Sequence, residues 1–313
     1  MITDVWKYRG KSKRFFFDFY QCHTISTDTN AGVNSPEAVF SKIFESYSEG
    51  RDKTVRKIGN KLVEMRFMER TDYGFRGVIG KHRTNNLPHV AVAGGEEREI
   101  KLEINENLLE KAYFHFYTQD SVLIIQRNRL CYGWLLLSKY LSNSSQNTTV
   151  NPIIQTSSLK WLMRNEVRIK TLEIGIARPK NVQLYEDVEH NFNNALIATL
   201  NGTNSAKVNL TLRGDSRSED PESRYLGSQL KRAFKETLET FEVEKLKLET
   251  QDIETGVQHP IDLVADKLVY YTDVELGGRY PLVGSIWSAL TLAKDSKDDE
   301  LKAYFGVANQ RVD

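Results

Sequence analysis

The run Phe15-Phe-Phe-Asp-Phe-Tyr-Gln21 is the feature of the sequence that most strongly predicts a strand, because consecutive aromatic residues suit a pleated surface packed on at least one face. A helix is predicted next, with Ser35 as N-cap, Pro36 at its first position and Gly50 as its stop. Apolar residues between these limits recur at helical spacing and form one stripe. The two elements together indicate a fold that mixes strands with amphipathic helices.

The segment 53–70 predicts a hairpin that turns at Gly59-Asn60. Alternation along its second strand predicts that Val63, Met65 and Phe67 face inward, whereas Glu64, Arg66 and Met68 face the other way. Basic residues then occupy the outer face of the hairpin and its first strand.

Short strands are expected further along the first half, and a helix closes it. The expected strands are 89–93, 100–104, 112–117 and 122–126, and the helix is 130–141. The polar run 142–149 is rich in Ser, Asn and Thr, which favour solvated turns. We therefore predict a domain boundary there.

The second half predicts a similar mixture of elements. The expected strands are 166–177, 207–213, 243–250 and 267–275, and the expected helices are 184–200, 222–241 behind Asp220-Pro221, and 284–304. The predicted fold class is α+β, with two subdomains that each contain a mainly antiparallel sheet and packed helices. Residues 1–142 form the basic, candidate nucleic-acid-binding domain, and residues 150–313 the candidate dimerisation domain.

Charge is distributed unevenly along the chain. The whole protein has a formal charge of +1, yet the first 83 residues contain 16 Lys and Arg against 10 Asp and Glu. A surplus of this kind indicates an anionic partner. Aromatic residues beside the basic ones suit nucleic acid, and we expect binding to duplex DNA with little sequence preference. The candidate nucleic-acid-binding residues are Lys7, Arg9, Lys11, Lys13, Arg14, Arg51, Lys53, Arg56, Lys57, Lys61, Arg66, Lys81 and Arg83.

No motif in the sequence specifies a reaction, a metal site or a cofactor. The six histidines and two cysteines form no pair at the spacing of a zinc site. Two alternatives remain open. The first is a metal-dependent nuclease, for which Glu242, Glu244 and Lys245, with Glu166 and Lys170, supply the residue types. The second is a protein-interaction subunit whose basic face meets an acidic partner.

Other expectations concern compartment and assembly. The chain begins without an apolar signal core, and its apolar runs are too short to cross a bilayer, so a cytoplasmic protein without a membrane span is expected. The acidic surplus of the second half and the apolar stripe of 222–241 predict a homodimer.

Two parts of the sequence resemble known groups of proteins. The segment 122–129, followed by a helix that ends at Tyr140-Leu141, resembles a family of uncharacterised proteins from bacterial mobile elements. The second half is similar in the order of its elements to RexA-type phage-exclusion proteins and KwaB-type antiphage proteins, through 167–176, 208–212, 243–248, 260–263 and 267–270. The resemblance implies a dimeric, cytoplasmic, DNA-interacting protein of phage defence or prophage exclusion and carries over no catalytic residue. A partner protein of a defence system is left open.

Overall fold

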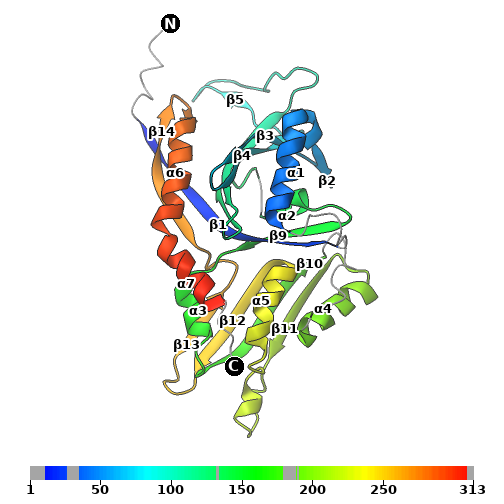
Figure 1. Ribbon diagram of the computed structural model, residues 1–313, viewed down its shortest axis with the longest axis vertical. Helices are drawn as coiled ribbons and strands as arrows, with labels where there is room; N and C mark the ends of the chain where they lie inside the picture. Colours follow the sequence, from blue (N-terminus) through cyan, green and yellow to red (C-terminus); the bar gives the residue numbers. More distant parts are fainter. Residues whose placement is uncertain (1–10, 27–34, 132–133, 179–187, 189, 309–313) are drawn as a thin grey trace.

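The computed structural model describes residues 11–26, 35–131, 134–178, 188 and 190–308, which form two main antiparallel sheets with helices packed on them (Figure 1). The predicted α+β class is confirmed. The larger sheet has nine strands in the order β15-β14-β1-β8-β7-β4-β3-β2, with β9 also paired to β1. Its strands are β1 (Ser12–Ser26), β2 (Arg56–Ile58), β3 (Lys61–Thr71), β4 (Gly74–Arg83), β7 (Leu108–Tyr117), β8 (Val122–Gln126), β9 (Gln146–Pro152), β14 (Val269–Gly277) and β15 (Tyr280–Pro281).

Strand β1 joins the two halves of the chain. Strand β8 lies along one edge of it, whereas β14 pairs with its beginning and β9 with its end along the other edge. The aromatic run is buried on both faces of the sheet. Phe17 and Phe19 enter one hydrophobic cluster, and Tyr20 enters a second one on the opposite face.

Helices cover both faces of the nine-stranded sheet. Helices α1 (Pro36–Glu49) and α2 (Trp134–Leu141) cover the face of the second cluster, and Phe40 of α1 stacks on Phe116 with ring centroids 4.2 Å apart. Helices α6 (Val283–Ser296) and α7 (Asp298–Ala308) follow the sheet's other side, beside β14 in Figure 1.

The smaller sheet has four strands in the order β11-β10-β12-β13. They are β10 (Val167–Ala177), β11 (Lys207–Arg213), β12 (Glu242–Asp252) and β13 (Gln258–Asp262). The remaining helices are α3 (Thr156–Leu162), α4 (Asn191–Gly202) and α5 (Leu230–Thr240), and α4 packs on α5 and β11. The first cluster continues from this sheet to α6 and to Phe17 and Phe19 of β1.

The predicted solvated run at 142–149 is confirmed only at its start, where Ser144 and Ser145 are exposed, and is wrong from Gln146 onward. Strand β9 lies there, and all of its residues are buried. Polar groups of this strand are hydrogen-bonded: the Gln146 side chain donates to the Leu141 carbonyl at 3.1 Å, Thr148 Oγ1 lies 3.1 Å from Thr24 Oγ1, and Ser138 Oγ donates to the Thr148 carbonyl at 2.7 Å. Because β9, β14 and β15 belong to the larger sheet, the division into 1–142 and 150–313 does not coincide with the two sheets. That the halves are separate domains stays a prediction.

The structure corrects five further expectations. A bulge between Met65 and Phe67 shifts the alternation in β3, so Met68 and not Phe67 joins Val63 in the second cluster. Residues 100–104 form no strand; instead, the short strands β5 (Val90–Ala91) and β6 (Glu97–Arg98) pair in an excursion between β4 and β7.

The expected helix 222–241 is a 3-10 turn, η4 (Glu222–Arg224), followed separately by α5. The expected helix 284–304 is divided at Lys297 into α6 and α7. The apolar stripe of 222–241 that predicts a dimer contact is core: Phe234 of α5 is 3% exposed, and Phe241, directly after α5, is 0% exposed. Dimerisation stays a prediction with no surface assigned to it. Among the helices in the described ranges, none has both the length and the apolar character needed to cross a bilayer.

Candidate nucleic-acid interface

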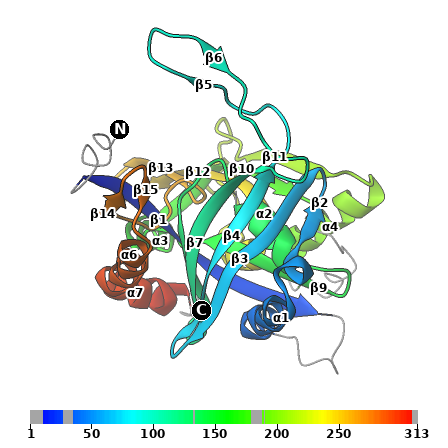
Figure 2. The same cartoon turned by 90° about the horizontal axis from the view of Figure 1, so that it is seen from above.

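Charged side chains gather at one end of the nine-stranded sheet, on the face that α1 and α2 cover further along. Strand alternation places them there, because residues two apart point the same way. Arg127 follows buried Ile125, Lys81 follows buried Ile79, and Glu110, the cross-strand partner of Lys81, precedes buried Ala112. The excursion with β5 and β6 projects from this end of the sheet (Figure 2).

A first hollow of about 250 Å³ lies where β1, the loop after β8 and the segment before β14 meet. It is lined by Asp18, Tyr20, Arg127, Asn128, Arg129, Trp134 and Lys267. These residues come from three distant parts of the sequence, so only the folded chain assembles the hollow.

Asp18 is the buried anchor of the first hollow, with only 2% of the residue exposed. The Nε atom of Arg127 lies 3.1 Å from both carboxylate oxygens of Asp18, and the Nζ atom of Lys267 lies 3.0 Å from one. A buried carboxylate requires such partners to offset its desolvation. Asp18 therefore holds two cationic side chains in place and is itself more than neutralised. Burial, and next the Asp18 charge, raise the pKa of Tyr20 far above its usual range.

An aromatic ledge, consisting of Phe16 and Tyr271, adjoins the first hollow. The two residues are cross-strand partners with ring centroids 5.9 Å apart, and they are 38% and 58% exposed. The Arg127 guanidinium lies 5.2 Å from the centre of the Phe16 ring, and that of Arg14 lies 5.2 Å from the centre of the Tyr271 ring. Basic and aromatic groups thus alternate along this surface.

A second hollow, of about 360 Å³, lies at the ends of β3, β4 and β7. Its charged lining residues are Lys61, Lys81, Arg83, Arg129 and Glu110, so Arg129 lines both hollows. Within the described residues, Lys61, Lys81 and Arg129 take part in no ion pair of 4.0 Å or less. We call the six cations of the two hollows the basic track; they are Lys61, Lys81, Arg83, Arg127, Arg129 and Lys267.

The structure separates the predicted binding residues into groups. Lys61, Lys81 and Arg83 come together in the basic track, and Arg14 lies on the adjoining ledge. Lys7 and Arg9 lie outside the described residues. Lys11 directly precedes β1, and Lys13 and Arg14 are within it, so these residues flank or form a sheet strand and not a separate arm.

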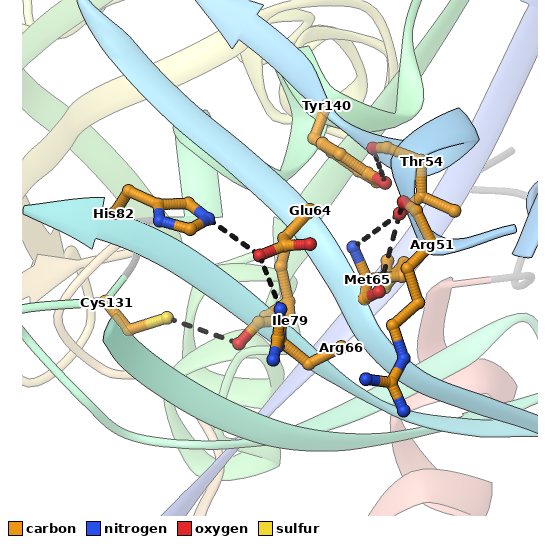
Figure 3. Close-up of polar contacts among 9 residues, drawn as sticks. All are labelled: Arg51, Thr54, Glu64, Met65, Arg66, Ile79, His82, Cys131 and Tyr140. Carbon is orange, nitrogen blue, oxygen red and sulfur yellow. Dashed lines mark hydrogen bonds and ion pairs between the residues drawn. The ribbon is translucent and has the colours of Figure 1, made fainter. Parts of the chain in front are cut away.

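The segment 51–57 supports the far edge of the sheet and not the basic track. The Tyr140 hydroxyl donates to the Thr54 carbonyl at 2.8 Å, and Thr54 Oγ1 donates to the Arg51 carbonyl at 2.7 Å (Figure 3). This anchors the 3-10 turn η2 (Arg51–Thr54), and burial raises the pKa of Tyr140 to about 12. Arg56 donates to the Tyr140 carbonyl and lies over its ring. Lys53 lies 3.7 Å from Asp52, and Lys57 is exposed on β2.

Arg66 is committed to a contact inside the protein. Its guanidinium lies 3.0 Å from Glu64 Oε1, which also lies 2.6 Å from Nε2 of His82 (Figure 3). Glu64 is 4% exposed, so this network satisfies a buried carboxylate. The Arg66 chain packs against Gly80, where a Cβ atom would lie 2.9 Å from Arg66 Cγ. A Cβ atom at Gly80 would lie on the opposite face from the Lys81 side chain. Arg66 therefore lies on the other side of the sheet from Lys81.

Sequence reasoning missed Arg127, Arg129 and Lys267. A signal existed for the first two, since Arg127-Asn-Arg129 is a basic pair directly after a buried strand. No local signal identifies Lys267, because its role depends on the distant pairing of β1 and β14.

The residues considered for a nuclease are engaged differently. Lys245 forms an ion pair with Glu173 of the neighbouring strand β10, and Glu244 forms one with Lys207 of β11, on the far side of β10. In the described part of the chain, no three His, Cys, Asp or Glu side chains gather as a metal site would require.

Comparison with known proteins adds a family but no activity. None of the curated proteins compared matches the chain. A family model covers residues 10–285, which include both sheets and every residue of the basic track. The chain therefore belongs to the family of unknown function DUF6731.

Proposed function

We propose that this protein binds nucleic acid along the basic track. The observation that carries the proposal is the charge balance of the two hollows: six cations and only two carboxylates, Asp18 and Glu110, line them. Phosphate groups neutralise such cations while the counterions of the nucleic acid are released. The shared residue Arg129 makes the two hollows adjacent, so one backbone can contact both.

The exposed aromatic ledge supports nucleic acid over an acidic protein as the partner. Nucleic acid offers bases that stack on aromatic rings as well as phosphates, whereas an acidic protein surface offers mainly charge. Phe16 and Tyr271 lie beside the first hollow and carry cationic groups over their rings. Contacts of this kind to backbone and base faces predict little sequence preference.

A matched pair of triple variants tests the proposal. The first is Lys61→Ala with Lys81→Ala and Arg129→Ala, which removes track cations that form no ion pair with any described residue. We expect its affinity for a labelled oligonucleotide to fall about 10- to 100-fold at ~0.1 M salt.

The control variant is Lys207→Ala with Lys245→Ala and Lys247→Ala. It removes equal charge from the smaller sheet, where each lysine already has an acidic partner. Its affinity should change by less than about threefold. Equal losses in the two variants would show that net charge alone drives binding and would refute the assignment to the basic track.

The role in phage exclusion or defence is proposed from the resemblance in element order described above. A plating assay with cells that produce the first triple variant tests it together with the site. Protection that survives in a variant without nucleic-acid binding would separate the two proposals.

A further inference from the structure

We infer that the first hollow receives an unpaired nucleobase, and that the nucleic acid bound along the basic track is therefore single-stranded. This inference rests on the proposed function and specifies the form of the ligand. It concerns the surface around Trp134, an aromatic residue that the distribution of basic residues along the sequence does not single out.

The lining of the first hollow suits one base and its phosphates. Half-buried Trp134 contributes the aromatic surface, alongside the buried Tyr20, while Arg127, Arg129 and Lys267 contribute positive charge. A base has an apolar face for stacking, and its flanking phosphates require cations nearby. The volume, about 250 Å³, is small for a ligand site and suits a single ring system with its sugar.

The loop that shapes the hollow is ordered by its own hydrogen bonds. The Asn128 side chain donates to the Lys111 carbonyl at 2.8 Å and accepts from the Leu130 amide at 3.0 Å. The Cys131 amide donates to the Asn128 carbonyl at 3.1 Å. Arg127 and Arg129 flank this fixed residue, so little ordering of the backbone is needed when a ligand binds.

The buried carboxylate does not oppose a phosphate. Asp18 contacts both Arg127 and Lys267, and this group of three has a surplus of one positive charge before Arg129 is counted. Asp18 instead fixes the two cations beside the hollow. Such preorganisation favours binding because fewer side-chain rotamers are lost.

The neighbouring ledge extends the same mode of binding. A second base can stack on exposed Tyr271 or Phe16, next to the base in the hollow. Paired bases in a duplex are stacked inside the helix and do not present a free face to either place. Stacking at both positions therefore requires an unpaired strand.

The direct test compares three probes of equal length, about 12 residues or base pairs. They are a deoxythymidine single strand, an abasic strand with the same phosphates, and a blunt duplex. For the wild-type protein, we expect the deoxythymidine strand to bind about 5- to 30-fold more tightly than the abasic strand, and more tightly than the duplex. Equal affinity for the first two, with steep salt dependence, would overturn this inference while the proposed function stands. No measurable binding of any probe would overturn both.

Two tryptophan variants locate the effect. Trp134→Leu should lower the preference for the deoxythymidine strand over the abasic strand at least about threefold, to the share that the ledge contributes, and should leave abasic binding within about twofold. Trp161→Leu is the control, because Trp161 lies in α3 and donates to Thr250 of the smaller sheet. Its preference should match that of the wild type, and melting temperatures of both variants would confirm folding. An undiminished preference in folded Trp134→Leu protein would overturn the assignment to the first hollow.

Discussion

The two sheets carry similar kinds of residue but use their charges differently. In the four-stranded sheet, Lys207, Lys245 and Lys247 each form an ion pair with an acidic residue of another strand of the same sheet. At the end of the nine-stranded sheet, Lys61, Lys81 and Arg129 surround a hollow and form no such pair within the described residues.

The difference shows that the position of acidic partners, and not the number of basic residues, marks the candidate binding surface. Exposed cross-strand pairs stabilise a protein little and leave little charge for a ligand. Cations without partners cost stability through mutual repulsion, which a polyanion would relieve.

Truncation within the larger sheet is expected to have the largest effect on stability. A fragment of residues 1–142 lacks β9, β14 and β15, so one edge of β1 would be unpaired along its whole length. It would also lack α6, which covers part of the first cluster. We expect no cooperative thermal transition by circular dichroism, and aggregation through the exposed strand edge. A monomeric fragment that melts cooperatively would show that residues 1–142 are an independent domain.

A smaller effect is expected when the buried ion pair of the larger sheet is broken. Arg127→Ala should lower the free energy of unfolding by about 3 kcal/mol, because Asp18 would remain buried with one cation fewer. Denaturant titration measures this, with Lys245→Ala in the exposed pair as the control, for which little change is expected.

The double variant Asp18→Asn with Arg127→Ala sharpens this test. Because it removes the buried charge as well as its partner, it should be more stable than Arg127→Ala alone. If the double variant is no more stable than Arg127→Ala alone, the desolvated Asp18 charge is not the cause of the lost stability.

The pH dependence of stability gives a further contrast between a buried and an exposed histidine. Burial, and next the nearby Arg76, lower the pKa of His115 to about 4 in the folded protein. The unfolded chain binds this proton near pH 6.5, so the stabilisation is complete above that pH and is lost as the pH falls toward 4. The contribution is on the order of 3 kcal/mol.

Replacement of His115 by Gln should make the unfolding free energy depend less on pH between pH 6.5 and 4, as measured by denaturant titration across that range. His259 is exposed beside Trp161, so His259→Gln should leave the profile as it is in the wild type. An unchanged profile in His115→Gln would assign the acid sensitivity to other groups.

The sequence predicted those parts of the fold that depend on local periodicity. The strands at 15–21, 112–117, 122–126 and 207–213, and the helix after Ser35, correspond to elements of the structure. Strand β9 was missed because its residues are polar, and its burial depends on hydrogen bonds to α2 that local pattern does not show. The bulge in β3 was missed for a similar reason, since one extra residue reverses the faces without a change in composition.

The candidate site was predicted only in part. Clustering in sequence led to Lys61, Lys81 and Arg83, but it also included Arg66 and Arg56, whose partners Glu64 and Tyr140 are visible only in the structure. Lys267 contacts Asp18 across 249 positions of the sequence. Partners at such separations decide which cations remain for a ligand.

Salt dependence of binding tests the central claim most directly. The slope of log affinity for a single-stranded oligonucleotide against log salt should be about −3 to −4 for the wild type, since about five phosphates would contact the track. In Lys61→Ala with Lys81→Ala and Arg129→Ala, the slope should become shallower by about 2, whereas Lys207→Ala with Lys245→Ala and Lys247→Ala should keep the wild-type slope. A wild-type slope near zero, or the same slope in all three proteins, would contradict the account.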